Sequence, residues 1–238
     1  MENPLVKLVP QLFGEYPKPF IKLIENIPLS PGQDSEEQAK TLWKAYEFGF
    51  RYHDGQKRLS GKPYFSHCLA VANTLASWKM DTTTVIAGLL HDTVEDTDAT
   101  IEQITENFGE DLAGLVDGLT KISEISYSSR KEKQAGNFMK MLLSVAQDMR
   151  VIIIKFADRL HNMETLRHMT QIKRHRIAVE TRDIYVPLAH RLGMSSVKSQ
   201  LEDLVFTVLN PTGYQEMESK IKSSEKQRQK FISKVITP

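Results

Sequence analysis

The stretch Leu89-Leu90-His91-Asp92-Thr93-Val94-Glu95-Asp96-Thr97 ends a long apolar run with a His-Asp pair and a cluster of acids. The seven residues from Asp92 to Asp98 contain four carboxylates and no basic side chain, at Asp92, Glu95, Asp96 and Asp98. Carboxylates at this density repel one another unless protons or a cation neutralise them. A divalent metal is the expected cation, because histidine and carboxylate together form a borderline-hard ligand set. The stretch therefore indicates a metal-dependent hydrolase rather than a passive binding domain.

Length and composition predict one large globular domain, or one domain with an extension. The chain has 238 residues, 40% of them hydrophobic, and its formal charge of +1 favours neither nucleic acid nor an acidic membrane. The single cysteine, Cys68, excludes an intramolecular disulfide and a cysteine-based zinc cluster. No apolar run approaches the roughly 20 residues of a transmembrane helix, and the N-terminus is unlike a signal peptide. We therefore expect a cytoplasmic protein with no membrane anchor and no direct contact with nucleic acid.

Apolar residues recur at helical spacing almost throughout, which predicts an all-α fold with at most a short β-hairpin. Asp81 is the expected N-cap of the helix that leads to the His-Asp pair, and Thr100 with Gln103 has capping-box spacing. Residues 55–63 are expected to form a basic loop and residues 126–133 a polar one. After an N-terminal region of short helices and turns, helices are expected at 36–53, 65–78, 81–90, 100–109, 110–122, 134–147, 151–168, 173–192, 198–209 and 211–235.

The expected helix at 151–168 has two distinct faces. Its apolar stripe consists of Ile153, Phe156, Leu160, Met163 and Leu166. A polar stripe at spacings of three and four consists of Lys155, Asp158, Asn162 and Thr165. A carboxylate, an amide and a hydroxyl thus point the same way from an anchored helix. A solvated surface face is the simpler interpretation of this helix taken alone.

A candidate metal site combines this helix with two others. His67, the pair His91-Asp92 and Asp158 provide two imidazoles and two carboxylates, all on expected helices. Each histidine alone is better explained as a hydrogen-bonded core residue, but the four together with the adjacent acids favour a metal. Because this set has nitrogen and oxygen ligands and no thiolate, manganese, iron and zinc are all chemically possible.

Four longer strings show a resemblance to a known family. They are HDGQKRLSGKPYFSH at 53–67, LLHDTVEDT at 89–97, IIKFADRLHNMETL at 153–166 and YVPLAHRLGMSSVK at 185–198. In this order they resemble the HD superfamily of metal-dependent phosphohydrolases, and more narrowly the hydrolase domain of the Rel/SpoT homologues. The resemblance covers about residues 35–210 and implies an HD-type helical bundle.

The resemblance implies a reaction and a metal. Rel/SpoT hydrolase domains remove the 3′-pyrophosphate of the guanine nucleotide alarmones ppGpp and pppGpp, leaving GDP or GTP and controlling alarmone level in the stringent response. The metal, usually Mn²⁺, would be held by His67, His91, Asp92 and Asp158. Glu95 and Asp96 match the pair that activates or orients the attacking water.

Other matched positions concern the substrate. Arg58 and Ser60 correspond to the family's substrate-binding loop, which Lys57 makes more basic, although a solvated basic turn would look the same in isolation. Asn162 and Thr165 correspond to positions near the guanine. Three further residues, Leu59, Cys68 and Glu164, depart from frequent family residues, which leaves substrate preference and rate open.

The resemblance also implies a domain organisation. Residues 1–200 would form the HD-type hydrolase domain, and residues 201–238 a helical connector toward synthetase and regulatory domains of a longer chain. Two alternatives stay open. One is an HD phosphohydrolase that acts on a different nucleotide, and the other is a catalytically silent domain that binds nucleotide and regulates a neighbour.

Overall fold

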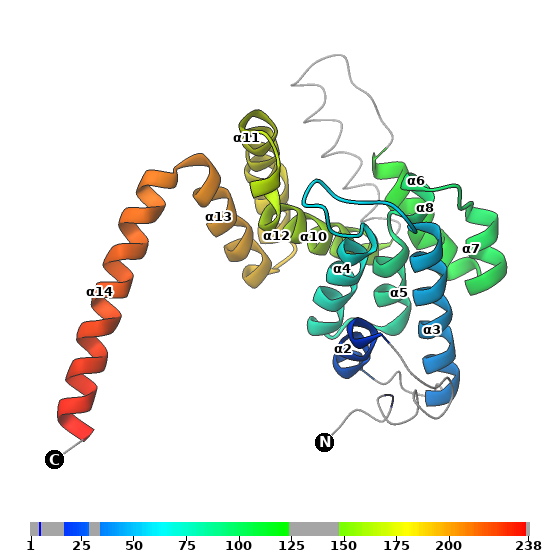
Figure 1. The fold of residues 1–238 in the computed structure, drawn as a ribbon, viewed down its shortest axis with the longest axis horizontal. Helices are drawn as coiled ribbons and strands as arrows, with labels where there is room; N and C mark the ends of the chain where they lie inside the picture. The colour runs from blue at the N-terminus through cyan, green and yellow to red at the C-terminus, as the bar shows by residue number, and fades with distance from the viewer. Residues whose placement is uncertain (1–4, 6–16, 29–33, 124–147, 237–238) are drawn as a thin grey trace. The chain divides into compact units, whose positions relative to one another are not determined.

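The computed structural model describes residues 5, 17–28, 34–123 and 148–236 (Figure 1). The chain divides into two compact units, Met1–His168 and Met169–Pro238, which are described separately below. The predicted polar loop at 126–133 and the predicted helix at 134–147 lie outside the described residues.

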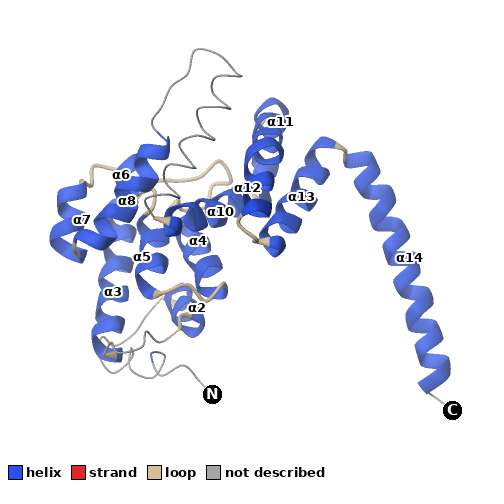
Figure 2. Ribbon diagram, turned by 180° about the vertical axis from the view of Figure 1, so that it is seen from behind, coloured by secondary structure: helices blue, strands red, loops and turns tan. Residues whose placement is uncertain are grey.

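The first unit is built from helices, as predicted (Figure 2). In its described part the strand-like pairing is an isolated antiparallel bridge between Lys57 and Pro63, inside the predicted basic loop. The helices are α2 (Lys18–Asn26), α3 (Ser35–Tyr52), α4 (Phe65–Ser77), α5 (Thr82–Leu90), α6 (Thr93–Asp96), α7 (Ile101–Phe108), α8 (Glu110–Ser123), α10 (Met149–Glu164) and the 3₁₀ turn η1 (Leu166–His168).

Helix α5 is the centre of this unit. It packs against α3, α4, α8 and α10, and every one of its residues except Thr83 is buried. Its start is set by Asp81, whose carboxylate accepts a hydrogen bond from the backbone N–H of Thr84 at 3.0 Å. Gly88 lets α4 approach closely, because a Cβ added there would lie 2.3 Å from Cδ1 of Leu75. The buried helix therefore delivers the His-Asp pair at its end from a rigid support.

Helix α10 is anchored in the same core. Asp148 caps it by accepting from the backbone N–H of Arg150 at 2.8 Å, and the predicted apolar stripe is buried at Phe156, Leu160 and Met163. The simpler interpretation of the polar stripe as a solvated face does not hold at Lys155, which is only 7% exposed. Its neighbours in the chain, Ile154, Phe156 and Ala157, are buried as well.

The second unit contains α11 (Gln171–Glu180), the π-helix η2 (Thr181–Tyr185), α12 (Val186–Arg191), α13 (Ser195–Leu209) and α14 (Pro211–Ile236). The predicted single α-helix at 173–192 is therefore interrupted. The N–H of Val186 bonds to the carbonyl of Thr181, five residues back, and Pro187 has no N–H to continue the ordinary ladder. Gly193 ends the run with φ of 72°, as predicted. The predicted domain boundary at 200/201 falls inside α13.

None of the described helices combines the length and apolarity needed to span a bilayer.

Candidate metal centre and substrate loop

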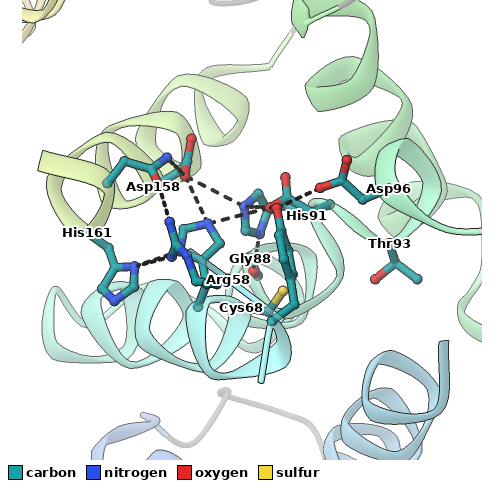
Figure 3. A network of polar contacts seen from close by, with 12 residues as sticks. Arg58, Cys68, Gly88, His91, Thr93, Asp96, Asp158 and His161 are labelled. Carbon is teal, nitrogen blue, oxygen red and sulfur yellow. Dashed lines mark hydrogen bonds and ion pairs between the residues drawn. The ribbon is translucent and has the colours of Figure 1, made fainter. Parts of the chain in front are cut away.

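Three elements of the first unit bring the predicted metal ligands together (Figure 3). His67 lies in the first turn of α4, and Asp158 lies in the second half of α10, which packs against α4. His91 and Asp92 form the turn between α5 and α6. This pair was expected to lie within a helix. The turn instead frees both side chains to point toward α4 and α10.

The four side chains form a compact cluster. Nε2 of His67 is 3.1 Å from Oδ1 of Asp158 and 3.5 Å from Oδ2 of Asp92. Nε2 of His91 is 3.0 Å from Oδ2 of Asp92 and 3.8 Å from Oδ1 of Asp158. Both histidines are buried, whereas the carboxylates keep 13% and 16% of their side-chain surface exposed. The cluster is thus open to solvent on its carboxylate side.

The donor arrangement fits a divalent cation. Nδ1 of His91 lies 2.8 Å from the carbonyl of Gly88 and donates to it, so in the neutral ring Nε2 carries a lone pair. This Nε2 is fully buried, has no hydrogen-bond partner of ordinary geometry, and faces the carboxylate of Asp92. Two acceptors in such contact repel each other unless a proton or a metal ion lies between them. A backbone carbonyl that accepts from the outer ring nitrogen of a ligating histidine is also a recurring feature of metal sites.

The electrostatics of the cluster favour bound positive charge. Burial opposes the charged form of His91, but the carboxylates of Asp92 and Asp158 outweigh it and raise its pKa. Burial likewise opposes ionisation of Asp158, but His67 and His91 lower its pKa to about 2. The carboxylates therefore stay ionised at neutral pH, as metal ligation requires.

Arg58 and Asn162, predicted from the sequence to bind substrate, lie against this cluster. The guanidinium of Arg58 donates from Nη2 to Oδ1 of Asn162 at 2.8 Å. Nδ2 of Asn162 in turn donates to Oδ1 of Asp158 at 2.6 Å. The basic loop and α10 are thus joined by hydrogen bonds that end on a candidate metal ligand.

His161 was not predicted as a site residue, although its spacing of three from Asp158 places it on the same face of α10. Nδ1 of His161 is 2.6 Å from Nδ1 of His67 and 3.1 Å from Nη1 of Arg58 (Figure 3). Burial, followed by the electrostatic effects of the neighbouring His67 and Arg58 side chains, lowers the pKa of His161 to about 4. His161 is therefore neutral at physiological pH.

Tyr64 was missed as well. Its hydroxyl donates toward Oδ2 of Asp92 at 2.8 Å and Oδ2 of Asp96 at 2.6 Å. Its ring stacks on buried His53, with centroids 5.0 Å apart and an interplanar angle of 16°. Burial and the negative charge of Asp92 raise the pKa of Tyr64, so the phenol stays a hydrogen-bond donor. No motif in the sequence indicates this role beyond the position of Tyr64 in the first long string.

Cys68 also lies at the edge of the cluster. Its sulfur is close enough to His91 and Asp92 for their ligand atoms to fall within 4.8 Å of one another. Burial, followed by the charge of Asp92, raises the pKa of this thiol well above its ordinary value. Cys68 is therefore a protonated thiol beside the four predicted ligands, which include no thiolate.

The remaining predicted site residues do not contact the histidine–aspartate cluster as directly. Glu95 and Asp96 are both exposed, on the single turn of α6, and Asp96 is held by Tyr64. The hydroxyl of Thr165 donates to the carbonyl of His161 at 2.8 Å. In the loop, Lys57 is exposed and Ser60 is partly buried. The structure thus joins the four predicted ligands directly and leaves the substrate-loop positions at their border.

Comparisons with known proteins agree with this geometry. Residues 45–195 match the HD domain family. The chain therefore belongs to the HD domain family. Within it, the chain resembles Rel/SpoT-type proteins, as the sequence analysis indicated. It is 45% identical over 202 residues to the bifunctional (p)ppGpp synthase/hydrolase SpoT of Escherichia coli. It is 47% identical over 202 residues to a guanosine-3′,5′-bis(diphosphate) 3′-pyrophosphohydrolase of Aquifex aeolicus.

These relatives are much longer. The Escherichia coli and Aquifex aeolicus alignments each cover 85% of this chain but 29% of the relative. A GTP pyrophosphokinase of Myxococcus xanthus is 51% identical over 192 residues, which are 79% of this chain and 25% of that protein. A solved structure described as a metazoan SpoT orthologue that hydrolyses ppGpp matches with a TM-score of 0.58 and 28% identity, over 70% of this chain and 93% of its own.

Proposed function

We propose that this chain hydrolyses the 3′-pyrophosphate of ppGpp and pppGpp. Water would attack the pyrophosphate group, the bond to the ribose 3′-oxygen would break, and pyrophosphate and GDP or GTP would leave. The observation that carries this proposal is the cluster of two histidines and two aspartates in an HD-family chain. Identity of 45–47% to proteins named for this hydrolysis supports the substrate, as does the solved metazoan relative.

The proposed metal ligands are His67, His91, Asp92 and Asp158, and the proposed metal is Mn²⁺. The buried lone pair of His91, facing ionised carboxylates, supports a divalent cation at this position. When bound, such a cation neutralises charge on phosphoryl oxygens and makes water more acidic. Asn162 would hold the Asp158 carboxylate in orientation through its 2.6 Å hydrogen bond.

Glu95 and Asp96 are the proposed catalytic pair. Both are on α6, directly after the ligand Asp92, and both are accessible to water. A carboxylate there takes the proton of the attacking water or aims its oxygen. We assign these two roles to Glu95 and Asp96 as a pair, and the hydrogen bond from Tyr64 orients the Asp96 carboxylate.

The proposed substrate contacts are Lys57, Arg58, Ser60, Asn162 and Thr165. Lys57 and Arg58 supply positive charge for the polyphosphate, and the planar guanidinium of Arg58 is also suited to stack on a base. The amide of Asn162 and the hydroxyl of Thr165 are suited to the hydrogen-bonding edge of guanine. Because Arg58 and Asn162 bond to each other in this structure, the nucleotide would exchange that contact for its own.

The proposal extends to the whole protein. Residues 1–200 would act as the hydrolase domain, and residues 201–238 as a connector to synthetase and regulatory domains in a longer chain. The HD match, which ends at residue 195, and the greater length of the relatives support this division. A cytoplasmic location suits a nucleotide substrate and a chain with a single, buried cysteine.

A substrate panel tests the reaction. The purified chain is incubated with Mn²⁺ and, separately, with ppGpp, pppGpp, GTP and dGTP, and nucleotide and phosphate products are quantified with an EDTA control. We expect equal amounts of GDP and pyrophosphate from ppGpp, lost with EDTA, and no turnover of GTP or dGTP. Turnover of dGTP or GTP without ppGpp hydrolysis would instead support an HD phosphohydrolase of a different substrate class.

A further inference from the structure

The contact between His67 and His161 has the geometry of an in-plane hydrogen bond. Their Nδ1 atoms are 2.6 Å apart, their ring centroids 4.8 Å apart, and the rings are inclined by 28°. Rings stacked face to face at this inclination would not bring two edge nitrogens so close. One of the two Nδ1 atoms must therefore carry the hydrogen and the other must accept it.

Arg58 decides which ring donates. A guanidinium carries only donors, and Nη1 of Arg58 lies 3.1 Å from the same Nδ1 of His161. Nδ1 of His161 is therefore an acceptor, shared between Arg58 and His67. The hydrogen of the His67–His161 bond must then lie on Nδ1 of His67. In the neutral His67 ring, which has a single N–H, this leaves the lone pair on Nε2.

That lone pair points to the cluster. Nε2 of His67 is 3.1 Å from Asp158 and 3.5 Å from Asp92, on the opposite edge of the ring from His161. We infer that His161 is a positioning residue for the metal centre: by accepting the Nδ1 hydrogen of His67, it keeps Nε2 of His67 free to ligate. This inference rests on the metal site of the proposed function.

The two candidate histidine ligands differ in how their outer nitrogens are held. Nδ1 of His91 donates to a backbone carbonyl, which can only accept. Nδ1 of His67 is instead paired with the ring of His161, whose Nδ1 would be a donor in its other tautomer. The hydrogen bond from Arg58 to Nδ1 of His161 excludes that tautomer. Since Arg58 also belongs to the proposed substrate loop, the loop and the ligand His67 are joined through His161.

Binding of Mn²⁺ alone tests the inference without turnover. Free Mn²⁺ is measured by electron paramagnetic resonance with the wild-type chain, His161→Leu and His161→Asn, in the absence of nucleotide. Asparagine keeps an acceptor near the position of Nδ1, and leucine removes it at similar size. Loss of a group that hydrogen-bonds to a metal ligand weakens metal affinity about 10–100-fold. We expect that loss in His161→Leu and affinity close to wild type in His161→Asn.

The outcomes separate the inference from the metal site itself. Absence of Mn²⁺ binding by the wild-type chain would overturn the metal site and the inference together. Wild-type affinity in His161→Leu, or equal loss in both variants, would overturn only the role of His161. If His161→Leu does not fold, imidazole nitrogen NMR of the wild-type chain decides. A hydrogen on Nδ1 of His67 supports the inference, and one on Nε2 contradicts it.

Discussion

Tyr64 links Asp96 to Asp92: its hydroxyl lies 2.6 Å from Oδ2 of Asp96 and 2.8 Å from Oδ2 of Asp92, a candidate metal ligand. The two carboxylates accept from the same hydroxyl, which orients them relative to each other. Tyr64 directly follows the basic loop and precedes α4. The residue therefore connects the substrate loop, a proposed ligand and the proposed catalytic pair.

Tyr64→Phe removes this hydroxyl and keeps the ring on His53. We expect kcat for ppGpp to fall about tenfold, because the charged hydrogen bonds that orient both carboxylates are lost. The melting temperature should change little, since the ring contacts remain. Steady-state kinetics with a thermal melt check this, with Tyr52→Phe as the control. Tyr52 is also hydrogen-bonded through its hydroxyl, but to Gln103. Equal kinetics in wild type and Tyr64→Phe would remove the tyrosine from the mechanism.

Glu95→Gln keeps the size of the side chain and removes the base. Mn²⁺ affinity should be retained, because Glu95 is not a proposed ligand, while kcat should fall roughly 10²–10⁴-fold. Rapid-quench kinetics beside Mn²⁺ titration separate the two quantities. The exposed Glu106→Gln on α7 is the matched control. An unchanged rate in Glu95→Gln would assign proton transfer to another group.

Much of the site could be predicted from the sequence, and the reason is physical. Residue type and order along the chain predicted His67, His91, Asp92 and Asp158 as candidate ligands, and the structure places these four side chains together. Periodicity predicted most of the helices that carry them. The residues that contact these four side chains, His161 and Tyr64, could not be predicted in this way. The role of His161 depends on how closely α10 packs against α4, and that of Tyr64 on the turn after α5.

Two predictions about the helices themselves were wrong. Helical spacing cannot distinguish a regular helix from one with a π-helical turn, so the interruption at Thr181–Tyr185 was not expected. Polarity alone also placed Lys155 on a solvated face, although tertiary packing buries it. Contacts with residues distant in the sequence bury Lys155, whereas the interruption coincides with Pro187, which has no N–H for the ordinary helical ladder.

Gly88→Ala tests the support of the His-Asp pair. The added methyl would lie 2.3 Å from Cδ1 of Leu75, and overpacking of this kind costs about 1–3 kcal/mol. We expect a lower free energy of unfolding by urea denaturation. Gly114→Ala on α8 is the control, because no atom lies within 4 Å of its added Cβ, and it should stabilise by about 0.5–1 kcal/mol. Equal effects of both substitutions would show that α4 yields at this contact.

Asp148→Asn tests the cap of α10 through pH. Hydrogen bonds from Arg150 lower the pKa of Asp148 below its ordinary value. A carboxylate whose folded pKa is depressed adds stability above its unfolded pKa of about 4, and loses it as pH falls through the folded value. Asparagine can still cap the helix but lacks the charge. The variant should be less stable than wild type at pH 7, with the difference shrinking on acidification.

Urea denaturation of both proteins between about pH 2.5 and 7 measures this difference. The exposed Asp54→Asn serves as the control for the loss of one surface charge. A stability difference that is constant with pH would mean that the charge of Asp148 contributes nothing to the cap.

The most direct test of the account compares ppGpp hydrolysis by the wild-type chain and Asp158→Asn at saturating Mn²⁺. Asparagine preserves the shape of the side chain but removes the negative charge that a ligand supplies. We predict that GDP and pyrophosphate release falls by roughly 100-fold or more, beyond the loss expected for an outer-shell residue, while circular dichroism is unchanged. Hydrolysis by Asp158→Asn at the wild-type rate would contradict the proposed metal centre.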